Sequence, residues 1–322
     1  MEKWIKGILL SFVILFSIVS LIPYLIHIKN TNNFSYKLPF NESELVEVDG
    51  VSIHYRKWIP ESEIILGKIL FIHGLGGSTF SWRYNIEYFT DKGYVVVAID
   101  LPGFGYSSKE SEIDHSQKNR SKLVWKVIDE IEVSLHEDVK DMNWVLVGHS
   151  MGGGTVTAMS MERPERVDKG ILVAGSVFEN NPSYISKVID YYPPFKRLGL
   201  VIFERYVDKD RIRSFLTSAY GREPSVEEVS GYLEPLIYSP DNKYIFDVVN
   251  TAKNEDISFL NNLNVHFYGI WGEKDSWVPI TEGERIKNLV ESFDLLVIED
   301  AYHCPMETHY NEFNSILLGI MK

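Results

Sequence analysis

The sequence contains a single cysteine, Cys304, among its 322 residues. One thiol cannot form an intramolecular disulfide, so cysteine content does not identify the redox compartment of the protein. Zinc-type spacings of cysteine and histidine are missing, and so are a Walker loop and a G-x-G-x-x-G run after a strand. The sequence therefore implies no metal ion and no organic cofactor.

Basic residues are few relative to acidic ones: 32 Lys and Arg stand against 45 Asp and Glu, and the net charge is −13. A surface of this sign repels phosphate backbones, so we expect no binding to nucleic acid. Internal repeats and low-complexity tracts are also absent from the sequence. A chain of this length with 45% hydrophobic residues can bury a substantial core, and no feature of it points to a particular protein partner.

Residues 1–30 have the length and composition of a membrane span. From Gly7 to Ile28 the chain carries no Asp, Glu, Lys or Arg. About 20 apolar residues cross a bilayer, whereas the apolar core of a cleaved signal is only about 7–15 residues long and ends at a small-residue site. The segment therefore predicts an uncleaved single-pass membrane anchor, with a cleaved secretory signal as the alternative.

The charges that flank this segment bear on its orientation. Lys3 and Lys6 favour a cytoplasmic amino terminus and an extracytoplasmic domain, although Lys29 and Lys37 on the other flank oppose that orientation. The polar, turn-rich residues that follow predict a linker over 31–43. A single domain is then expected from 44 to 322.

Within that domain, short apolar runs alternate with segments of helical spacing. An Asp49-Gly50 pair predicts a hairpin turn inside residues 45–58. Helical spacing predicts helices over 79–93 and 116–137. Alternation of this kind predicts an α/β fold, a mostly parallel twisted sheet with helices on both faces. The strands expected to be buried are 68–74, 94–100, 144–148, 169–175, 265–272 and 294–300.

The strand patterns stop between residues 178 and about 260. Prolines separate helical stretches in this segment, and tyrosine and phenylalanine are frequent in it. Structureless loops of such length are rare, so we expect a helical cap inserted into the α/β domain. Most of its aromatic side chains are expected to form a small core of the cap itself, and a few to line a pocket beneath it.

Residues Gly148–Gly152 read GHSMG and fit the pattern G-x-S-x-G. A nucleophile at a strand end must turn sharply into a helix, and flanking glycines remove the side chains that would collide there. The amino terminus of the following helix favours negative charge. Five-residue patterns recur by chance, but a buried strand precedes this one and a helix-compatible segment follows it. Ser150 is therefore the candidate nucleophile.

Five motifs, each after a predicted strand, occur in an order that resembles the α/β-hydrolase superfamily. The similarity extends from about Leu45 to the carboxyl terminus and is strongest to the branch of esterases, lipases and C–C bond hydrolases with a helical cap. It implies the α/β-hydrolase fold and a serine nucleophile. The motifs are FIHGLGGS, IDLPGFGYS, VGHSMGG, IWGEKDSWVP and IEDAYHCPME.

Taken residue by residue, the resemblance implies Ser150 as nucleophile, His303 as its base and Asp275 as the acid that orients the base. The chain order Ser, Asp, His is the usual one for this fold. A plain turn aspartate is the alternative reading of Asp275. Some family members carry the acid after the strand that follows the nucleophile helix, which would nominate Glu179.

The sequence has nine histidines, so a lone histidine proves little. Only His303 lies in a short loop at the carboxyl end of a predicted strand after the acid. His115 and His136 are expected on the solvated surface. The family usually has a glycine directly before the histidine, whereas this chain has Tyr302. Cys304 follows the histidine, lacks a nucleophile elbow and is expected only to pack.

Hydrolysis through an acyl-enzyme also needs N–H donors for the oxyanion. By the resemblance, these would be the backbone N–H groups of Met151 and Leu75. The function expected is hydrolysis of carboxylic esters with apolar or lipid-like acyl groups, a small-molecule substrate. C–C bond hydrolases, perhydrolases and aminopeptidases share the same triad and stay open as alternatives, as does a non-catalytic binding protein on this fold.

Overall fold

A computed structural model describes residues 2–26, 38–62, 64–109, 113–178, 192–238, 247–248 and 251–322. Its strands are β1 (Ser43–Val48), β2 (Val51–Trp58), β3 (Gly67–Ile72), β4 (Tyr94–Ile99), β5 (Trp144–His149), β6 (Val167–Val173), β7 (His266–Gly272) and β8 (Phe293–Ile298). In these residues they form one eight-stranded sheet, ordered β1-β2-β4-β3-β5-β6-β7-β8. Only the β1–β2 and β2–β4 pairs are antiparallel, so the predicted mostly parallel sheet is confirmed.

The strand boundaries follow the hydrophobic pattern of the sequence. Every residue of β4 and β5 is buried, as the continuous apolar runs predict for strands covered on both faces. The β1–β2 hairpin turns at Asp49 and Gly50, whose φ angles are 52° and 76°. Two successive positive φ angles are what a tight hairpin turn of the primed type requires.

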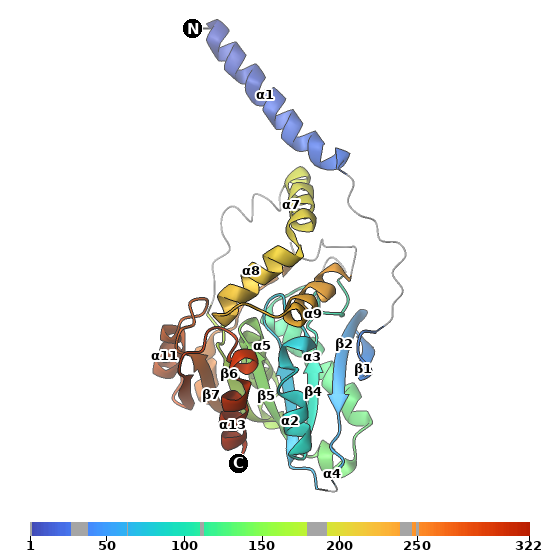
Figure 1. Ribbon diagram of the computed structural model, residues 1–322, viewed down its shortest axis with the longest axis vertical. Helices are drawn as coiled ribbons and strands as arrows, with labels where there is room; N and C mark the ends of the chain where they lie inside the picture. The colour runs from blue at the N-terminus through green and yellow to red at the C-terminus, as the bar shows by residue number, and fades with distance from the viewer. Residues whose placement is uncertain are drawn as a thin grey trace.

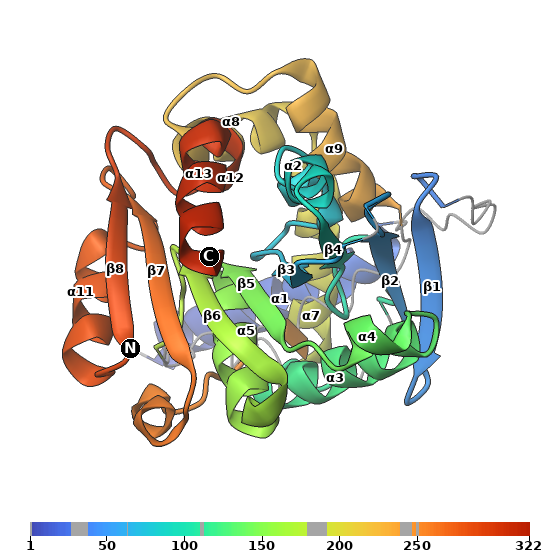
Figure 2. The same cartoon turned by 90° about the horizontal axis from the view of Figure 1, so that it is seen from below.

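The helices cover both faces of the sheet (Figures 1 and 2). On one face α2 and α13 contribute to a core with Phe71, Phe89 and Phe313, and on the other α3 and α5 contribute to a core with Trp125. The helices of the domain are α2 (Ile86–Asp91), α3 (Gln117–Val133), α4 (Glu137–Lys140), α5 (Met151–Glu162), α11 (Ile280–Leu289), α12 (Pro305–Thr308) and α13 (Tyr310–Met321), with 3₁₀ turns η1 (Thr79–Trp82), η2 (Pro164–Arg166) and η3 (Ile257–Asn262).

The single helix predicted over 79–93 is wrong, because η1 and α2 are separate elements. Asn85 marks the break: its side-chain amide donates to the Met306 carbonyl (3.2 Å) and to Asn314 Oδ1 (2.8 Å). These partners are more than 200 residues away along the chain, so the local sequence pattern could not predict the contacts. The contacts anchor the segment to α12 and α13, the two helices that follow β8.

His115 is fully buried, which corrects the expectation that it lies on the solvated surface. Its backbone N–H donates to Thr251 Oγ1 at 2.7 Å, so a segment distant in sequence covers this loop. Burial, with the charge of Arg120 as a smaller cause, lowers the pKa of His115 to about 4. The polar sequence around His115 suggested a surface, but tertiary packing encloses it.

Between β6 and β7 the described part of the chain includes the helices α7 (Pro193–Tyr206), α8 (Lys209–Tyr220) and α9 (Val226–Ile237). They lie above the sheet domain in Figure 1. Tyr220 and Tyr232 pack into the core cluster on the α2 and α13 side of the sheet, rather than into a core confined to this segment. Residues 179–191, 239–246 and 249–250 of the predicted cap lie outside the described residues.

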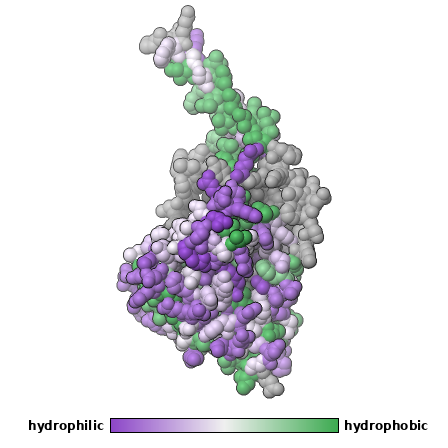
Figure 3. Space-filling view, viewed as in Figure 1, coloured by the Kyte–Doolittle hydropathy of each residue, from purple (hydrophilic) through white to green (hydrophobic). Residues whose placement is uncertain are grey.

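Helix α1 (Glu2–Leu25) projects away from the rest of the molecule (Figures 1 and 3). Its segment Trp4–Leu25 is long and apolar enough to cross a membrane, and only 6% of it is buried. A signal sequence near the amino terminus can also form an apolar helix, so this finding does not separate the two. Most of the predicted linker, residues 31–37, lies outside the described part of the chain.

Asp100, directly after β4, is a fully buried carboxylate that joins three segments. His54 Nδ1–H from β2 donates to Oδ2 (2.7 Å), the Thr79 N–H to Oδ1 (2.6 Å) and the Tyr106 N–H to Oδ2 (2.8 Å). Burial alone would raise the pKa of Asp100, but His54 and the other partners outweigh it and lower the pKa below its usual value. The folded state therefore favours the ionised carboxylate.

Replacing Asp100 by Asn should lower the free energy of unfolding by about 2–3 kcal/mol, because hydrogen bonds to a buried charge are lost. Since the folded-state pKa is lowered, the stabilisation is present at neutral pH and is lost as pH falls through that pKa. Thermal unfolding of the full chain in detergent tests this, with exposed Asp91→Asn as control. Equal stability of Asp100→Asn and wild type at pH 7 would contradict the assignment.

Candidate active site

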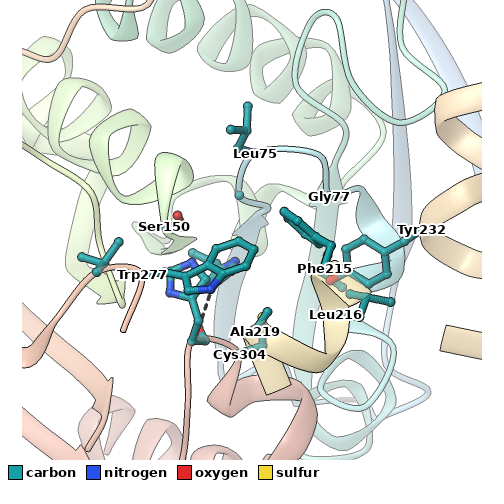
Figure 4. A pocket seen from close by; sticks show the side chains of 14 residues that line it. Leu75, Gly77, Ser150, Phe215, Leu216, Ala219, Tyr232, Trp277 and Cys304 are labelled. Carbon is teal, nitrogen blue, oxygen red and sulfur yellow. Dashed lines mark hydrogen bonds between the residues drawn. The ribbon is translucent and has the colours of Figure 1, made fainter. Parts of the chain in front are cut away.

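A cavity of about 210 Å³ lies at the carboxyl ends of the parallel strands, beneath α8 and α9 (Figure 4). Loops after β3, β5, β7 and β8 meet here, as open α/β sheets favour for ligand sites. The residues that line the cavity are Gly74, Leu75, Gly77, Ser81, His149, Ser150, Phe215, Leu216, Ala219, Tyr232, Trp277, Val278, His303 and Cys304.

Ser150 lies at the junction of β5 and α5 in a strained backbone conformation, with φ 50° and ψ −117°. A non-glycine residue with positive φ costs energy, so the surrounding structure must hold it. An added Cβ on Gly152 would lie 2.5 Å from the Ile72 carbonyl oxygen, and one on Gly148 would collide with the Gly152 carbonyl. The two glycines of G-x-S-x-G therefore allow α5 to pass directly over the end of β3.

The Ser150 side chain faces the cavity at the start of α5 (Figure 4). Its backbone is held on both sides: its N–H donates to the Val173 carbonyl (2.9 Å) and its carbonyl accepts from the Ser176 N–H (2.9 Å). Within the described residues the hydroxyl makes no hydrogen bond, so none joins it to His303. Catalytic hydrogen bonds are often loose or absent in ligand-free structures.

Asp275 and His303 are brought together from the loops after β7 and β8. His303 Nδ1 is 2.8 Å from Asp275 Oδ2, and both side chains are almost completely buried. The other carboxylate oxygen, Oδ1, accepts the N–H groups of Trp277 (2.8 Å) and Val278 (3.0 Å). The carboxylate is thus fixed by its own loop, and it orients the imidazole with Nδ1–H as donor.

Trp277 covers this pair. Its ring is stacked on the His303 ring, with centroids 5.2 Å apart. Its indole N–H donates to Ser218 Oγ of α8 at 3.0 Å, and its ring meets Phe215 edge-on at 4.5 Å. The His303 imidazole is therefore enclosed between its own loop and helix α8, which excludes water from one side of the ring.

His149, the residue before the candidate nucleophile, also contacts His303. Its Nε2–H donates to the His303 carbonyl oxygen at 2.9 Å. Burial, followed by the nearby His303, holds the pKa of His149 well below its usual value. A neutral His149 therefore links the end of β5 to the loop that carries His303. The variable residue before the serine of G-x-S-x-G thus has a structural role in this chain.

The two backbone N–H groups predicted for the oxyanion come from different elements of the fold. Met151 begins α5, where the first N–H groups have no acceptor within the helix. Leu75 lies in the loop after β3 and lines the cavity, and its N–H donates to no described residue. Asp100 holds the far end of that loop through the Thr79 N–H. Both N–H groups are therefore available to a ligand.

The structure bears differently on the other residues considered for catalysis or metal binding. Glu179, the alternative acid, lies outside the described residues. Cys304 is buried, and burial together with the charge of Glu307 raises its thiol pKa well above the usual value, which disfavours a thiolate. Among the described residues no group of three or more His, Cys, Asp or Glu side chains could hold a metal ion.

The sequence patterns did not anticipate Trp277 and Leu216 as covering residues, and they did not single out Phe215, although a few aromatic side chains of the cap were expected to line a pocket. Trp277 stands two residues after Asp275 within a quoted motif, but nothing local shows that it turns back over His303. Phe215 and Leu216 lie on α8, more than 60 residues from Ser150 along the chain. Their role depends on how the helices between β6 and β7 fold over the sheet.

Comparison with known proteins gives one family and several relatives. A family model described as alpha/beta hydrolase fold matches residues 68–310. A hydrolase of Bacillus subtilis, YugF, is 27% identical over 245 residues, covering 74% of this chain and 83% of its own. The 2-hydroxy-6-oxononadienedioate/2-hydroxy-6-oxononatrienedioate hydrolase of Escherichia coli is 24% identical over 266 residues, covering 79% and 86%.

Among solved structures, a membrane phospholipase A described as a bacterial virulence factor has a similar fold. The TM-score is 0.66 at 18% identity, and the match covers 99% of this chain and 97% of that one. A similarity at this identity concerns the fold alone.

Replacing Gly152 by Ala should destabilise the protein by about 3 kcal/mol or more, because the added methyl meets backbone rather than a movable side chain. Gly319 in α13 is the matched control, since a Cβ there meets nothing within 4 Å. Gly319→Ala should be neutral or stabilise by roughly 0.5–1 kcal/mol. Chemical unfolding measures both, and similar effects of the two changes would refute the close approach.

Proposed function

The chain belongs to the alpha/beta hydrolase fold family, and we propose that within it the protein is a serine hydrolase that cleaves carboxylic esters with apolar acyl groups. Ser150 is the nucleophile, His303 the base and Asp275 the orienting acid. The observation that carries the proposal is the 2.8 Å contact of His303 Nδ1 with the fixed carboxylate of Asp275, on the wall of the cavity that Ser150 also lines.

The reaction proceeds in two acyl transfers. When substrate fills the cavity, His303 Nε2 accepts the Ser150 proton and Oγ attacks the ester carbonyl carbon. The C–O bond to the alcohol breaks, and the alcohol leaves with the proton from His303. Water then attacks the acyl-enzyme by the same route and releases the carboxylic acid and free Ser150. Asp275 keeps the proton on Nδ1 and stabilises the imidazolium that forms in each step.

The carbonyl oxygen becomes negative in both transition states, and the N–H groups of Met151 and Leu75 would donate to it. Preorganised backbone donors of this kind are worth about 10²–10³ in rate each. These N–H donors need not move when charge develops. The start of α5 is fixed by the turn at Ser150 and its flanking glycines, and the loop that carries Leu75 is fixed by Asp100.

The lining of the cavity supports a neutral, apolar acyl group. The wall includes Phe215, Leu216 and Ala219 of α8 and Val278 of the loop after β7. Ligand pockets for drug-sized molecules run from about 300 to 1,000 Å³, so the cavity of about 210 Å³ suits one short or medium acyl chain. Neither lysine nor arginine occurs among the described residues of the lining.

The lining of the cavity also bears on the choice between a neutral ester and the dioate substrate of one relative. The relative from Escherichia coli hydrolyses a dienedioate, a molecule with two carboxylates. A buried carboxylate needs a cation or several donors to replace its water. The described wall is mainly apolar, and its Ser81 and Tyr232 hydroxyls already bond to each other, so a neutral ester is the better fit, and C–C bond cleavage of a dioate is the second candidate.

Contacts of α1 support a lipid-like source of substrate. Tyr192, at the start of α7, stacks on Phe16 (5.5 Å) and shares a hydrogen bond with Ser20 Oγ (2.7 Å), and Arg197 Nε donates to the Pro23 carbonyl (2.9 Å). Helices α7 and α8 therefore lie on the side from which α1 projects (Figure 1). If α1 crosses a bilayer, the cavity side faces the lipid surface, and a membrane phospholipase A shares this fold.

Replacing Ser150 by Ala should abolish labelling by a fluorophosphonate probe and lower ester turnover by about 10⁴-fold or more. Asp275→Asn should lower kcat by about 10⁴-fold, because the amide oxygen stays with the Trp277 and Val278 N–H groups and the amide N–H then faces Nδ1, which places the ring proton on Nε2. Exposed Ser315→Ala on α13 is the control and should behave as wild type. Folded wild-type protein that the probe does not label would instead favour a binding protein.

Replacing Leu216 by Ala should move the preferred acyl chain to roughly two methylenes longer, each buried methylene being worth ~0.8 kcal/mol. Values of kcat/KM for p-nitrophenyl esters of increasing length measure the shift, and a dioate substrate in the same panel tests the second candidate. Ser214→Ala, exposed on the same helix, should leave the profile unchanged. An unchanged profile in Leu216→Ala would remove α8 from the acyl site.

A further inference from the structure

Glu307 is a buried carboxylate in the short helix α12, four residues after His303, and it is only 1% exposed. Three donors from distant segments converge on it. Tyr232 OH donates to Oε1 (2.5 Å), and Tyr220 OH and Arg83 Nη1 both donate to Oε2, the tyrosine at 2.7 Å. Tyr220 ends α8, Tyr232 lies on α9 and Arg83 follows η1, so one carboxylate joins the cap helices α8 and α9 to the domain beneath.

The three partners of Glu307 stay protonated and therefore act as donors. Burial alone would lower the pKa of Arg83, but the charge of Glu307 outweighs it and the net shift is upward. Burial and the same negative charge raise the pKa values of Tyr220 and Tyr232. Both hydroxyls therefore remain donors, and a buried charge with three donors is held more strongly than a neutral acceptor.

A second layer of contacts extends the cluster. Arg83 Nη2 donates to Glu228 Oε1 of α9 at 3.2 Å, and Arg222 donates to the same carboxylate at 2.7 Å. Tyr232 OH is also 3.0 Å from Ser81 Oγ, and both residues line the cavity. The wall of the cavity and the cluster around Glu307 are therefore parts of one hydrogen-bonded network.

Helix α8 meets the loops of both the acid and the base. At its carboxyl end Gly221 has φ +67°, and a Cβ there would collide with the ring of Tyr302, the residue before His303. One turn earlier, Ser218 accepts the indole N–H of Trp277, which covers His303. Tyr302 stands where the family usually has glycine, so this sequence adds a side chain to the contact between α8 and the His303 loop.

We propose that Glu307 is a positioning residue, which holds the acyl-binding surface of α8 and α9 at a set distance from His303. The inference deepens the function proposed above and rests on it. The carboxylate acts through Tyr220 and Tyr232 on one side and through its own helix, joined to the His303 loop, on the other. It touches neither substrate nor reacting atoms, and it does not line the cavity.

The change Glu307→Gln keeps the shape of the side chain but replaces one acceptor oxygen by a donor amide. The amide then faces either Arg83, which cannot accept, or a tyrosine hydroxyl, which must turn its proton elsewhere. Loss of the negative charge also weakens the remaining contacts with α8, α9 and Arg83. An acyl group displaced by about 1 Å from its reactive position can lose about 10²-fold in rate. The apolar walls remain, so we expect kcat to fall by about tenfold to a hundredfold while KM changes little.

The test measures kcat and KM of the full chain in detergent on a short p-nitrophenyl ester, with active sites counted by fluorophosphonate titration. Turnover per titrated serine is independent of any misfolded fraction. Glu312→Gln, an exposed position on α13, is the matched control and should equal wild type. Turnover per serine in Glu307→Gln within about twofold of wild type would overturn the proposal.

Tyr220→Phe provides a second variant if Glu307→Gln folds poorly, since it removes one donor, keeps the ring and does not line the cavity. It should lower turnover per serine less than Glu307→Gln does. In the double variant its effect should vanish, because coupled residues are not additive. Full additivity of the two changes would show that Tyr220 and Glu307 act separately and would overturn the proposal.

Hydrogen exchange followed by mass spectrometry separates this inference from the proposed chemistry. Glu307→Gln should raise exchange in α8, in α9 and in residues 301–309 together, whereas Glu312→Gln should not. If wild type shows no esterase activity and no labelling but this joint change occurs, the coupling stands and the ester function fails. If exchange in the cap helices and the His303 loop changes independently, the coupling itself is refuted.

Discussion

The close approach of α5 to the end of β3 is the constraint on which the rest of the site depends. Gly152 passes so near the Ile72 carbonyl that no side chain fits between them. This contact forces the chain to turn abruptly after β5 and leaves Ser150 with positive φ. The turn directs the Ser150 side chain into the space where the loops after β3, β7 and β8 also end, so one steric condition sets where every other group must converge.

Buried carboxylates then organise those loops. Asp100 holds the loop that carries Leu75, Asp275 orients His303, and Glu307 joins the helices above to the segment below. Each receives several N–H or O–H donors, as a charge removed from water requires. Some of the acidic side chains that give the net charge of −13 are therefore buried and structural rather than exposed on the surface. Placing charge at these three points gives rigidity to loops that have little regular structure of their own.

The chemical character of the cavity comes from a different part of the chain. The sheet supplies Ser150, His303 and Asp275, whereas α8 supplies much of the apolar wall. Such a division allows one hydrolase scaffold to accept different substrates through changes in the helices between β6 and β7. The side from which α1 projects is the side of these helices, which relates the apolar wall to a lipid-like substrate in the proposed function.

The sequence by itself determined the order of strands and helices, the hairpin at Asp49-Gly50 and the turn around Ser150, because these depend on hydrophobic periodicity and on where glycine is required locally. Motif order also nominated Asp275 and His303, and the structure shows their side chains 2.8 Å apart. Tertiary structure alone decided the break before α2, the burial of His115 and the enclosure of His303 by Trp277. Those features arise from contacts between segments tens to hundreds of residues apart, and a local sequence pattern does not predict such contacts.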